Sequence, residues 1–328
     1  MRVVVRTNLG KGIGFGHFFR CLSIVTALKK ISQVEDIFVL NEETQFIDKQ
    51  KIVISENFDH NDISTIKSLN PDVVIFDSYQ ANSDYLKELS MIASLVVFDD
   101  NNDVYDRIYA DILINGNLYA TSLSYKSVKA NTIKLLGPKY LVMKPEYWYI
   151  EDGKRQSLQG EGILVTTGGS DFFKLMPMFV MGLKNLHIKK KIVIGPGYEE
   201  DEIKEIETLV DDSFEIIYKP GNLKPYIENT KIVLTTASTT VYEVLTLRKV
   251  PIVYVAADNQ IKLERVLKSY GVKSLGWHRQ IKWENLESEV REVFDRFIYY
   301  QETLKKLYDK FDGKGALRVA KIILKELV

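Results

Sequence analysis

The sequence has one cysteine, Cys21, among 328 residues, and only four histidines. A single thiol excludes an intramolecular disulfide and any Cys-rich zinc or iron–sulfur site. No apolar run approaches the ~18 residues of a membrane-spanning helix, so we expect no stable membrane insertion. The chain opens on MRVVVRT, which has the pattern of a strand and not of a signal peptide. We therefore expect a cytoplasmic protein.

The sequence also lacks an excess of charge of either sign. Lys and Arg total 44, Asp and Glu total 44, and the isoelectric point is near 6.9. This balance gives no bulk attraction to nucleic acid, so we expect no nucleic-acid partner. Hydrophobic residues make up 45% and charged residues 27%, which is typical of a globular protein. The length favours two domains. Nothing in the sequence identifies a protein partner.

Short β-branched runs alternate with segments of helical period, which is typical of α/β proteins with parallel sheets. The runs are apolar throughout, as expected for strands covered by helices on both faces. We expect strands at 3–6, 37–40, 51–54, 72–76, 95–98, 112–115, 163–167, 191–195, 214–218, 231–235 and 251–255. We expect helices at 18–30, 83–92, 172–183, 200–209, 239–247 and 260–269, with a helical tail from 283 that is interrupted at 312–315.

A polar segment with three glycines, residues 151–162, has the composition of a linker. It predicts two Rossmann-like domains with parallel sheets, residues 1–150 and residues 163–328, the second with the C-terminal helices. Ligands of such sheets bind at the carboxyl ends of the strands. We therefore expect the site in a cleft between the two domains.

A glycine-rich loop, NLGKGIGFG at 8–16, follows the first strand and precedes a helix. Glycines such as Gly14 and Gly16 let a backbone pass close to a ligand, and the helix start behind them attracts anions. The spacing differs from the dinucleotide fingerprint, and no lysine–serine pair follows as in a P-loop. We therefore expect no cofactor.

His17 stands in the first turn of that helix. The positive end of the helix dipole favours a neutral imidazole, which could act as a general base. The alternative is a histidine that only caps the helix or packs in the core. Arg20, one turn further on, could hold a phosphate or pair with a carboxylate. Packing is sufficient to explain Cys21.

Carboxylates follow two more strands of the first half, in Asp77-Ser78-Tyr79 and in Asp99-Asp100. The adjacent pair could suggest a metal ligand set, but no third ligand has a suitable spacing. We therefore interpret the pair as a turn and expect no metal site. The remaining histidines, which also lack partners at metal-ligand spacing, are interpreted as structural or surface residues: His60, His187 and His278.

In the second half, a strand ends in Gly168-Gly169-Ser170-Asp171 before a helix. Backbone amides and a helix start at a strand's carboxyl end again predict an anion site, which involves Gly169. We expect Asp171 to cap the helix.

A second turn of small residues, TTASTTVYE at 235–243, lies between a strand and a helix. Ser238, Thr239 and Thr240 could bind a diphosphate, and the Glu243 carboxylate could bind the two hydroxyls of a ribose. The alternative is a capping box, with Thr240 as the cap and Glu243 at the third helical position.

A third polar turn, Asp258-Asn259-Gln260, follows the strand at 251–255. Its carboxylate and amide groups offer several hydrogen bonds to a polyhydroxylated ligand. We therefore expect this turn to contact substrate.

Together, GFGHFFRCL, VTTGGSD, STTVYE and ADNQ resemble the nucleotide-sugar hydrolases of pseudaminic acid biosynthesis. That group includes spore-coat polysaccharide proteins and is similar in fold to the GT-B glycosyltransferase that makes the murein precursor lipid. The resemblance runs from residue 1 to about residue 269. The family usually has glycine in the turn where this chain has Ala237.

The resemblance implies that His17 activates water and that Tyr79 and Asn259 contact the sugar. It also implies that the second domain holds uridine diphosphate through matching residues: Gly169, Ser238, Thr239, Thr240 and Glu243. The implied reaction is inverting, metal-independent hydrolysis of a UDP-activated diacetamido-trideoxy-hexose, of the UDP-2,4-diacetamido-2,4,6-trideoxy-β-L-altropyranose type. Two alternatives stay open: a GT-B glycosyltransferase with a sugar or lipid acceptor, and a non-catalytic nucleotide-sugar binding protein.

Overall fold

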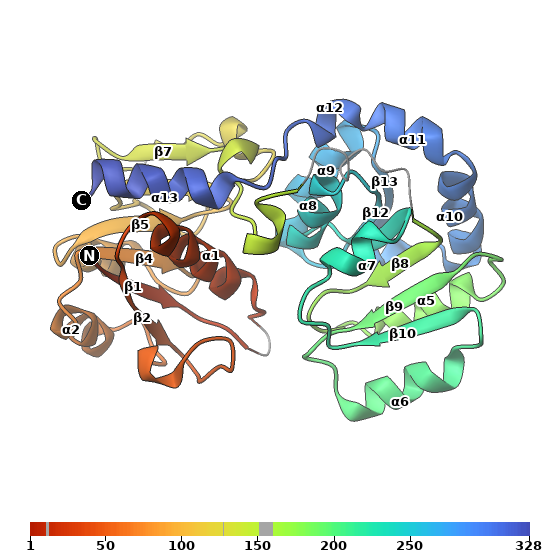
Figure 1. The fold of residues 1–328 in the computed structure, drawn as a ribbon, viewed down its shortest axis with the longest axis horizontal. Helices are drawn as coiled ribbons and strands as arrows, with labels where there is room; N and C mark the ends of the chain where they lie inside the picture. Colours follow the sequence, from red (N-terminus) through yellow and green to blue (C-terminus); the bar gives the residue numbers. More distant parts are fainter. Residues whose placement is uncertain (11–12, 127, 151–159) are drawn as a thin grey trace. The chain divides into compact units, whose positions relative to one another are not determined.

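The computed structural model describes residues 1–10, 13–126, 128–150 and 160–328. They form two α/β units, each built around one parallel sheet (Figure 1). The first unit comprises Met1–Trp148 and Gly313–Val328, and the second comprises Tyr149–Asp312. The prediction of two Rossmann-like α/β domains is therefore confirmed. Of the predicted linker, residues 151–159 lie outside the described residues.

The first sheet has seven strands in the order β3-β2-β1-β4-β5-β6-β7. The chain moves outward from β1 on one side and then returns to β4 on the other. This reversal is the place where open α/β sheets bind their ligands. The strands are β1 (Arg2–Thr7), β2 (Glu35–Leu40), β3 (Ile52–Ile54), β4 (Val73–Asp77), β5 (Ser94–Phe98), β6 (Ile112–Asn115) and β7 (Ile133–Leu136).

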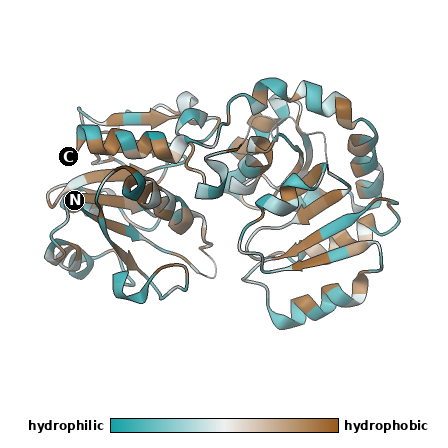
Figure 2. Ribbon diagram, in the orientation of Figure 1, coloured by the Kyte–Doolittle hydropathy of each residue, from teal (hydrophilic) through white to brown (hydrophobic). Residues whose placement is uncertain are grey.

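Helices cover both faces of the first sheet, because alternate residues of its strands point to opposite faces and nearly all are apolar. Val3 and Val5 belong to one apolar cluster, whereas Val4 belongs to another. Figure 2 shows hydrophobic strands and helices of mixed character. The helices are α1 (Gly16–Ile31), α2 (His60–Ser68), α3 (Ser83–Leu89) and α13 (Gly315–Glu326).

The last helix corrects the predicted domain boundary. Residues 163–328 were expected to form one domain, but α13 packs beside α1 in the first unit. Its apolar stripe, which includes Ala316, Val319 and Ile323, is buried in the same cluster as Phe18 and Trp148. A stripe at this helical spacing predicts burial, but it does not identify which sheet the helix covers.

The second sheet has six strands in the order β10-β9-β8-β11-β12-β13. Its central strands are again apolar and fully buried, and every neighbouring pair is parallel. The strands are β8 (Ile163–Thr166), β9 (Lys190–Ile194), β10 (Phe214–Tyr218), β11 (Ile232–Thr236), β12 (Val250–Val255) and β13 (Lys273–Trp277).

Helices connect these strands, and the tail from 283 is helical as predicted. Helix α5 begins three residues later than expected because Lys174 has a left-handed backbone, with φ of 52°. The helices are α5 (Leu175–Leu183), α6 (Glu200–Leu209), α7 (Lys224–Glu228), α8 (Thr239–Thr246), α9 (Ile261–Ser269), α10 (Leu286–Asp295), α11 (Phe297–Thr303) and α12 (Lys305–Tyr308).

Four short elements were not predicted: α2, β7, α7 and β13. The sequence analysis predicted no element around His60, but this residue begins the first turn of α2. Asp59 caps that helix by accepting hydrogen bonds from two backbone amides, at 2.9 and 3.1 Å. Only three side chains of α2 are buried, among them Ile63 and Ile66, so its apolar signal in the sequence is weak.

Candidate active site

Polar side chains gather at one edge of the first sheet. The glycine-rich loop follows β1, Asp77 ends β4, Asp99 and Asp100 follow β5, and Asn115 ends β6. These four strands are adjacent in the sheet, so their carboxyl ends meet at the same edge. The structure thereby brings together segments that are up to a hundred residues apart in the sequence.

The described glycines of the loop before α1 have backbone angles typical of turns. Gly10 and Gly14 have φ of 112° and 86°, values that side-chain-bearing residues rarely adopt. The amide of Gly14 donates to the carbonyl of Gly10 at 2.8 Å. A Cβ atom added at Gly14 or Gly16 would meet nothing within 4 Å. The part of the chain that the structure describes therefore leaves open space at Gly14 and Gly16, directly before His17.

His17 lies in the first turn of α1, as predicted, and its ring contacts a carboxylate that the sequence analysis did not pair with it. Nδ1 lies 2.7 Å from Oδ1 of Asp77, which is fully buried, while the His17 side chain is 16% exposed. Burial alone would raise the pKa of Asp77, but the charges and hydrogen bonds of Arg20 and His17 hold it at about 2.

Asp77 is therefore an ionised acceptor, and Nδ1 of His17 must carry the proton that it donates. The lone pair of the neutral ring is then on Nε2, which bonds to no other residue in the described part of the chain. The Asp77 carboxylate favours the protonated form of the ring. Its effect therefore opposes that of the helix dipole, which favours the neutral form. This arrangement fixes the tautomer of the ring and leaves Nε2 as the atom that can accept a proton.

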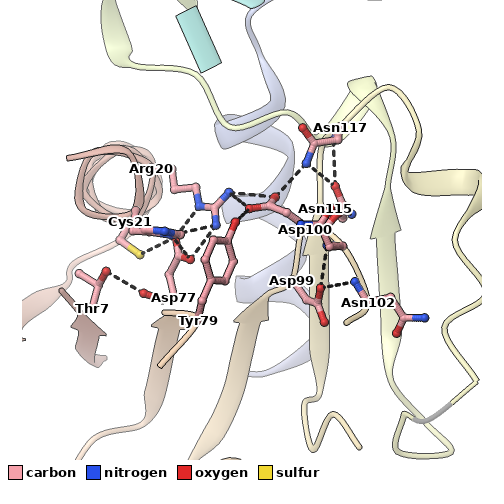
Figure 3. A network of polar contacts seen from close by, with 12 residues as sticks. Thr7, Arg20, Cys21, Asp77, Tyr79, Asp99, Asp100, Asn102, Asn115 and Asn117 are labelled. Atoms are coloured by element: carbon pink, nitrogen blue, oxygen red, sulfur yellow. Dashed lines mark hydrogen bonds and ion pairs between the residues drawn. The ribbon is translucent and has the colours of Figure 1, made fainter. Parts of the chain in front are cut away.

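Arg20 pairs with carboxylates, which was one of its two predicted roles. Its guanidinium donates to Asp77 through Nε and, at 2.7 Å, through Nη2. Nη1 donates to the two oxygens of Asp100 at 3.0 and 2.9 Å. Figure 3 shows Arg20 between the two carboxylates. The group also lies over the ring of Phe98, 4.5 Å from its centroid, so Arg20 joins the ends of β4 and β5.

Tyr79 contacts the residues of the His17 site through both its ring and its hydroxyl. The ring lies edge-on to His17, with 4.7 Å between centroids, and the hydroxyl donates to Oδ2 of Asp100 (Figure 3). Burial and the neighbouring carboxylate raise the pKa of Tyr79. Asn117 donates to the other Asp100 oxygen at 2.9 Å and to Asn115 at the same distance.

Asp99, in contrast, forms the turn that the sequence predicted. Its Oδ1 accepts hydrogen bonds from the backbone amides of Asn101 and Asn102, at 2.9 and 2.6 Å. Asp100 turns toward Arg20 instead. The two adjacent carboxylates therefore have different roles, and the interpretation of the pair as a turn holds for Asp99 alone.

The carboxylate of Asp77 should contribute to stability in a pH-dependent way. Its folded pKa of about 2 lies below the ordinary aspartate value of 3.8, so its contribution is complete above the unfolded pKa. The contribution disappears as the pH falls through the folded pKa. We expect Asp77→Asn to lower the free energy of unfolding by about 2 kcal/mol at neutral pH. Denaturant unfolding between pH 7 and pH 3 measures this, and a difference that does not shrink in acid would contradict it.

The predicted phosphate and sugar turns of the second unit also lie on adjacent strands. Gly169 follows β8, Ser238 follows β11, and Asp258 follows β12, three neighbours in the sheet. The carbonyl of Gly169 accepts from the amide of Gly197 at 2.8 Å. The structure thus groups these turns at one edge of the second unit and groups His17 with its neighbours in the first.

The capping-box interpretation of residues 235–243 is wrong. Helix α8 begins at Thr239, with Ser238 at the N-cap position and no side-chain capping bond. Thr240 is therefore inside the helix. The Ser238 hydroxyl bonds to that of Thr236 at 2.7 Å, and the Glu243 side chain is buried. The backbone amide of Ser238 donates to the carbonyl of Thr236 at 2.8 Å.

Ala237 replaces the glycine usual in the resembling family, and the structure accommodates it. Its φ is not in the left-handed region where glycine would be required. Its amide donates to the carbonyl of Tyr254 at 2.8 Å. Alanine therefore imposes no backbone strain on this turn.

The turn after β12 is a 3-10 helix over Asp258–Gln260. Asp258 and Asn259 are exposed, whereas Oε1 of Gln260 accepts from the amide of Ala256 at 2.8 Å. Two of the three predicted contact residues thus have accessible side chains, and Gln260 closes its own turn.

Three of the more conservative interpretations are confirmed. Asp171 caps α5, since its oxygens accept from the amides of Leu175 and Met176 at 2.9 and 2.7 Å. Burial raises the pKa of Asp171. His278 is buried, with its ring 4.3 Å from that of Phe173, and Cys21 is buried in the apolar cluster.

Sequence reasoning missed three members of the His17 site: Asp100, Asn115 and Asn117. The usable signal was a polar residue at the end of each of three buried strands. Which of these residues face one another depends on strand order, which the sequence pattern does not contain.

Among the described residues no group of three or more His, Cys, Asp and Glu has the arrangement of a metal site. In the same residues, no helix is long and apolar enough to span a membrane.

No family model matches the chain. An uncharacterised protein of Methanocaldococcus jannaschii is 28% identical over 282 residues, which cover 80% of this chain and 57% of that protein. The chain therefore spans less than two thirds of that relative. The spore coat polysaccharide biosynthesis protein SpsG of Bacillus subtilis is 23% identical, with 98% of each chain covered.

Solved structures show that the fold is GT-B. MurG of Acinetobacter baumannii superposes with a TM-score of 0.67, 15% identity and 99% of each chain covered. UDP-GlcNAc 2-epimerase of Neisseria meningitidis, bound to UDP-GlcNAc, gives 0.57 at 12% identity, covering 99% of this chain and 100% of that one. Arabidopsis thaliana UGT89C1, complexed with UDP-L-rhamnose, gives 0.65 at 10% identity, covering 99% and 98%.

Proposed function

We propose that this protein hydrolyses a UDP-activated sugar at its anomeric carbon and releases UDP and the free sugar with inversion. The substrate class is a UDP-diacetamido-trideoxy-hexose of the UDP-2,4-diacetamido-2,4,6-trideoxy-β-L-altropyranose type, used in nonulosonic acid or surface polysaccharide synthesis. One observation carries the proposal: Nδ1 of His17 is fixed by the buried Asp77 carboxylate, while among the described residues nothing bonds Nε2 and nothing fills the space at Gly14 and Gly16.

In the proposed reaction, Nε2 of His17 removes a proton from water as the water oxygen bonds to C1. The bond between C1 and the UDP oxygen breaks, and UDP leaves with the electron pair. The imidazolium that forms contacts the Asp77 carboxylate, and Arg20 links Asp77 to Asp100, so the group then holds two carboxylates, one guanidinium and one imidazolium. The local charge therefore becomes more balanced as the proton arrives, which stabilises the transition state.

The second unit supplies the proposed UDP site. The start of α8 has no side-chain cap, and it presents the positive end of the helix dipole, which is suited to a diphosphate. The hydroxyls of Ser238 and Thr239 lie in the same turn, and Gly169 follows the neighbouring strand. The same groups would stabilise charge that develops on departing UDP. The exposed side chains of Asp258 and Asn259 are proposed to contact the sugar.

Glu243 is proposed to bind the ribose hydroxyls, so Glu243→Ala should weaken UDP binding. Loss of a hydrogen-bonding partner costs about 1–3 kcal/mol, which corresponds to roughly tenfold to hundredfold in Kd. Titration calorimetry with UDP measures the change. Glu205→Ala, an exposed glutamate of α6 in the same unit, is the matched control. Equal UDP affinity for a folded Glu243→Ala variant and its control would remove Glu243 from the site.

The experiment that tests the reaction is UDP release from a panel of UDP-sugars, each with and without added sugar or lipid acceptors. Release without an acceptor, accompanied by free sugar of inverted configuration, supports hydrolysis. Release only with an acceptor would replace the hydrolase with a glycosyltransferase. Binding of UDP-sugars without any turnover would leave a non-catalytic binding protein.

A further inference from the structure

Asp100 connects more of the His17 site than any role in a turn requires. It accepts both hydrogen bonds from Nη1 of Arg20, the hydroxyl bond of Tyr79, and a 2.9 Å bond from Asn117. Its side chain is only 13% exposed. The carboxylate thus has donors on both oxygens and is held by residues from three other segments of the first unit.

The orientation of Tyr79 follows from that anchoring. Its hydroxyl is directed at Asp100, while its ring lies edge-on to His17. The residue as a whole is 37% exposed. A substrate at His17 would therefore meet the ring of Tyr79 and not the hydroxyl, which is engaged. Apolar ring surface suits the C–H groups and the methyl group of a deoxy sugar, which present no hydroxyl at those positions.

We propose that Asp100 is a positioning residue for the reaction at His17: it holds Arg20 against Asp77 and holds the Tyr79 ring beside the imidazole. This inference rests on the proposed function. Asp100 touches neither the substrate nor the reacting atoms, and it acts through Arg20 and Tyr79. Removal of its charge should loosen these two side chains and change the electrostatic environment of His17.

The sign of the electrostatic effect follows from the groups around the ring. With Asp100 neutral, the guanidinium of Arg20 is opposed by one carboxylate and not by two. A protonated His17 is then less stable, so its ring should titrate at lower pH. The charged and titratable groups that surround this ring directly or through one neighbour are Asp77, Arg20, Tyr79, Asp100 and Cys21.

The test compares Asp100→Asn with Asp106→Asn, an exposed aspartate in the same loop between β5 and β6. We expect Asp100→Asn to lower kcat about tenfold to hundredfold, as small misplacements of catalytic groups do, with little change in KM. The acid limb of kcat against pH and the NMR titration of the His17 ring should move to lower pH. Asp106→Asn should match the wild type in all three measurements.

Tyr79→Phe provides a second variant, because it removes the hydroxyl that reaches Asp100 and keeps the ring. We expect kcat to fall about tenfold, and the double variant with Asp100→Asn to be no slower than Asp100→Asn alone. Additive losses, an effect confined to KM, or a His17 titration unchanged in Asp100→Asn would overturn the inference. Absence of hydrolysis by the wild type would overturn the proposed function instead, since the NMR titration does not depend on turnover.

Discussion

His17→Ala should lower turnover of the UDP-sugar by about 10²–10⁴, the usual contribution of a positioned general base. UDP affinity should persist, because the proposed nucleotide contacts lie in the second unit. The wild-type rate should rise with pH through the titration of one imidazole and should not respond to chelators. Measurements of kcat over pH, together with calorimetry of UDP binding, separate the loss of chemistry from the loss of binding.

The matched control is His60→Ala, which removes an exposed histidine at the start of α2. It should keep wild-type turnover, since the His60 side chain is exposed and pairs with Glu88 at 3.7 Å, and neither residue belongs to the His17 site. Near-normal hydrolysis by a folded His17→Ala variant would remove His17 as the base. The proposed mechanism would then lack its general base.

Asp77→Asn should lower turnover about as much as His17→Ala does, by roughly 10²–10⁴, although it replaces only one carboxylate oxygen by an amide group. The amide cannot satisfy its neighbours in either orientation, because Nδ1 of His17 and Nε of Arg20 both donate to the carboxylate. An NH₂ group directed at His17 would favour the tautomer that has its proton on Nε2, which cannot accept one from water. The effect should fall on kcat, and UDP binding should be retained.

The control for this variant is Asp72→Asn, at the other end of the same strand region. Its carboxylate accepts a 2.7 Å bond from the amide of Arg2, far from the carboxyl edge. It should lower stability at most and leave turnover intact. Equal turnover in Asp77→Asn and Asp72→Asn would show that the tautomer of His17 does not limit the reaction.

Much of the fold was predictable from hydrophobic pattern. The central strands β1, β4, β8 and β11 are continuous apolar runs, because helices cover both faces of each sheet. The elements that were missed are weaker signals: β13 has a left-handed glycine, Gly276, with φ of 78°, and none of its residues is fully buried. Short elements at a sheet edge need few apolar contacts, so their sequences resemble loops.

The sequence by itself determined the two-domain α/β class, the glycine loop before His17, and the small-residue turns of the second unit, because each depends on residues that are neighbours in the chain. Only the tertiary structure decided that Asp77 fixes His17, that Asp100 joins Arg20 to Tyr79, and that α13 covers the first sheet. The contacts of Asp77 and Asp100 depend on strand order, and the position of α13 depends on which sheet its apolar stripe packs against. Both follow from packing between segments that are distant in the sequence. The local sequence pattern predicts that a strand ends in a polar residue. The order of the strands in the sheet determines which other residue that polar side chain contacts.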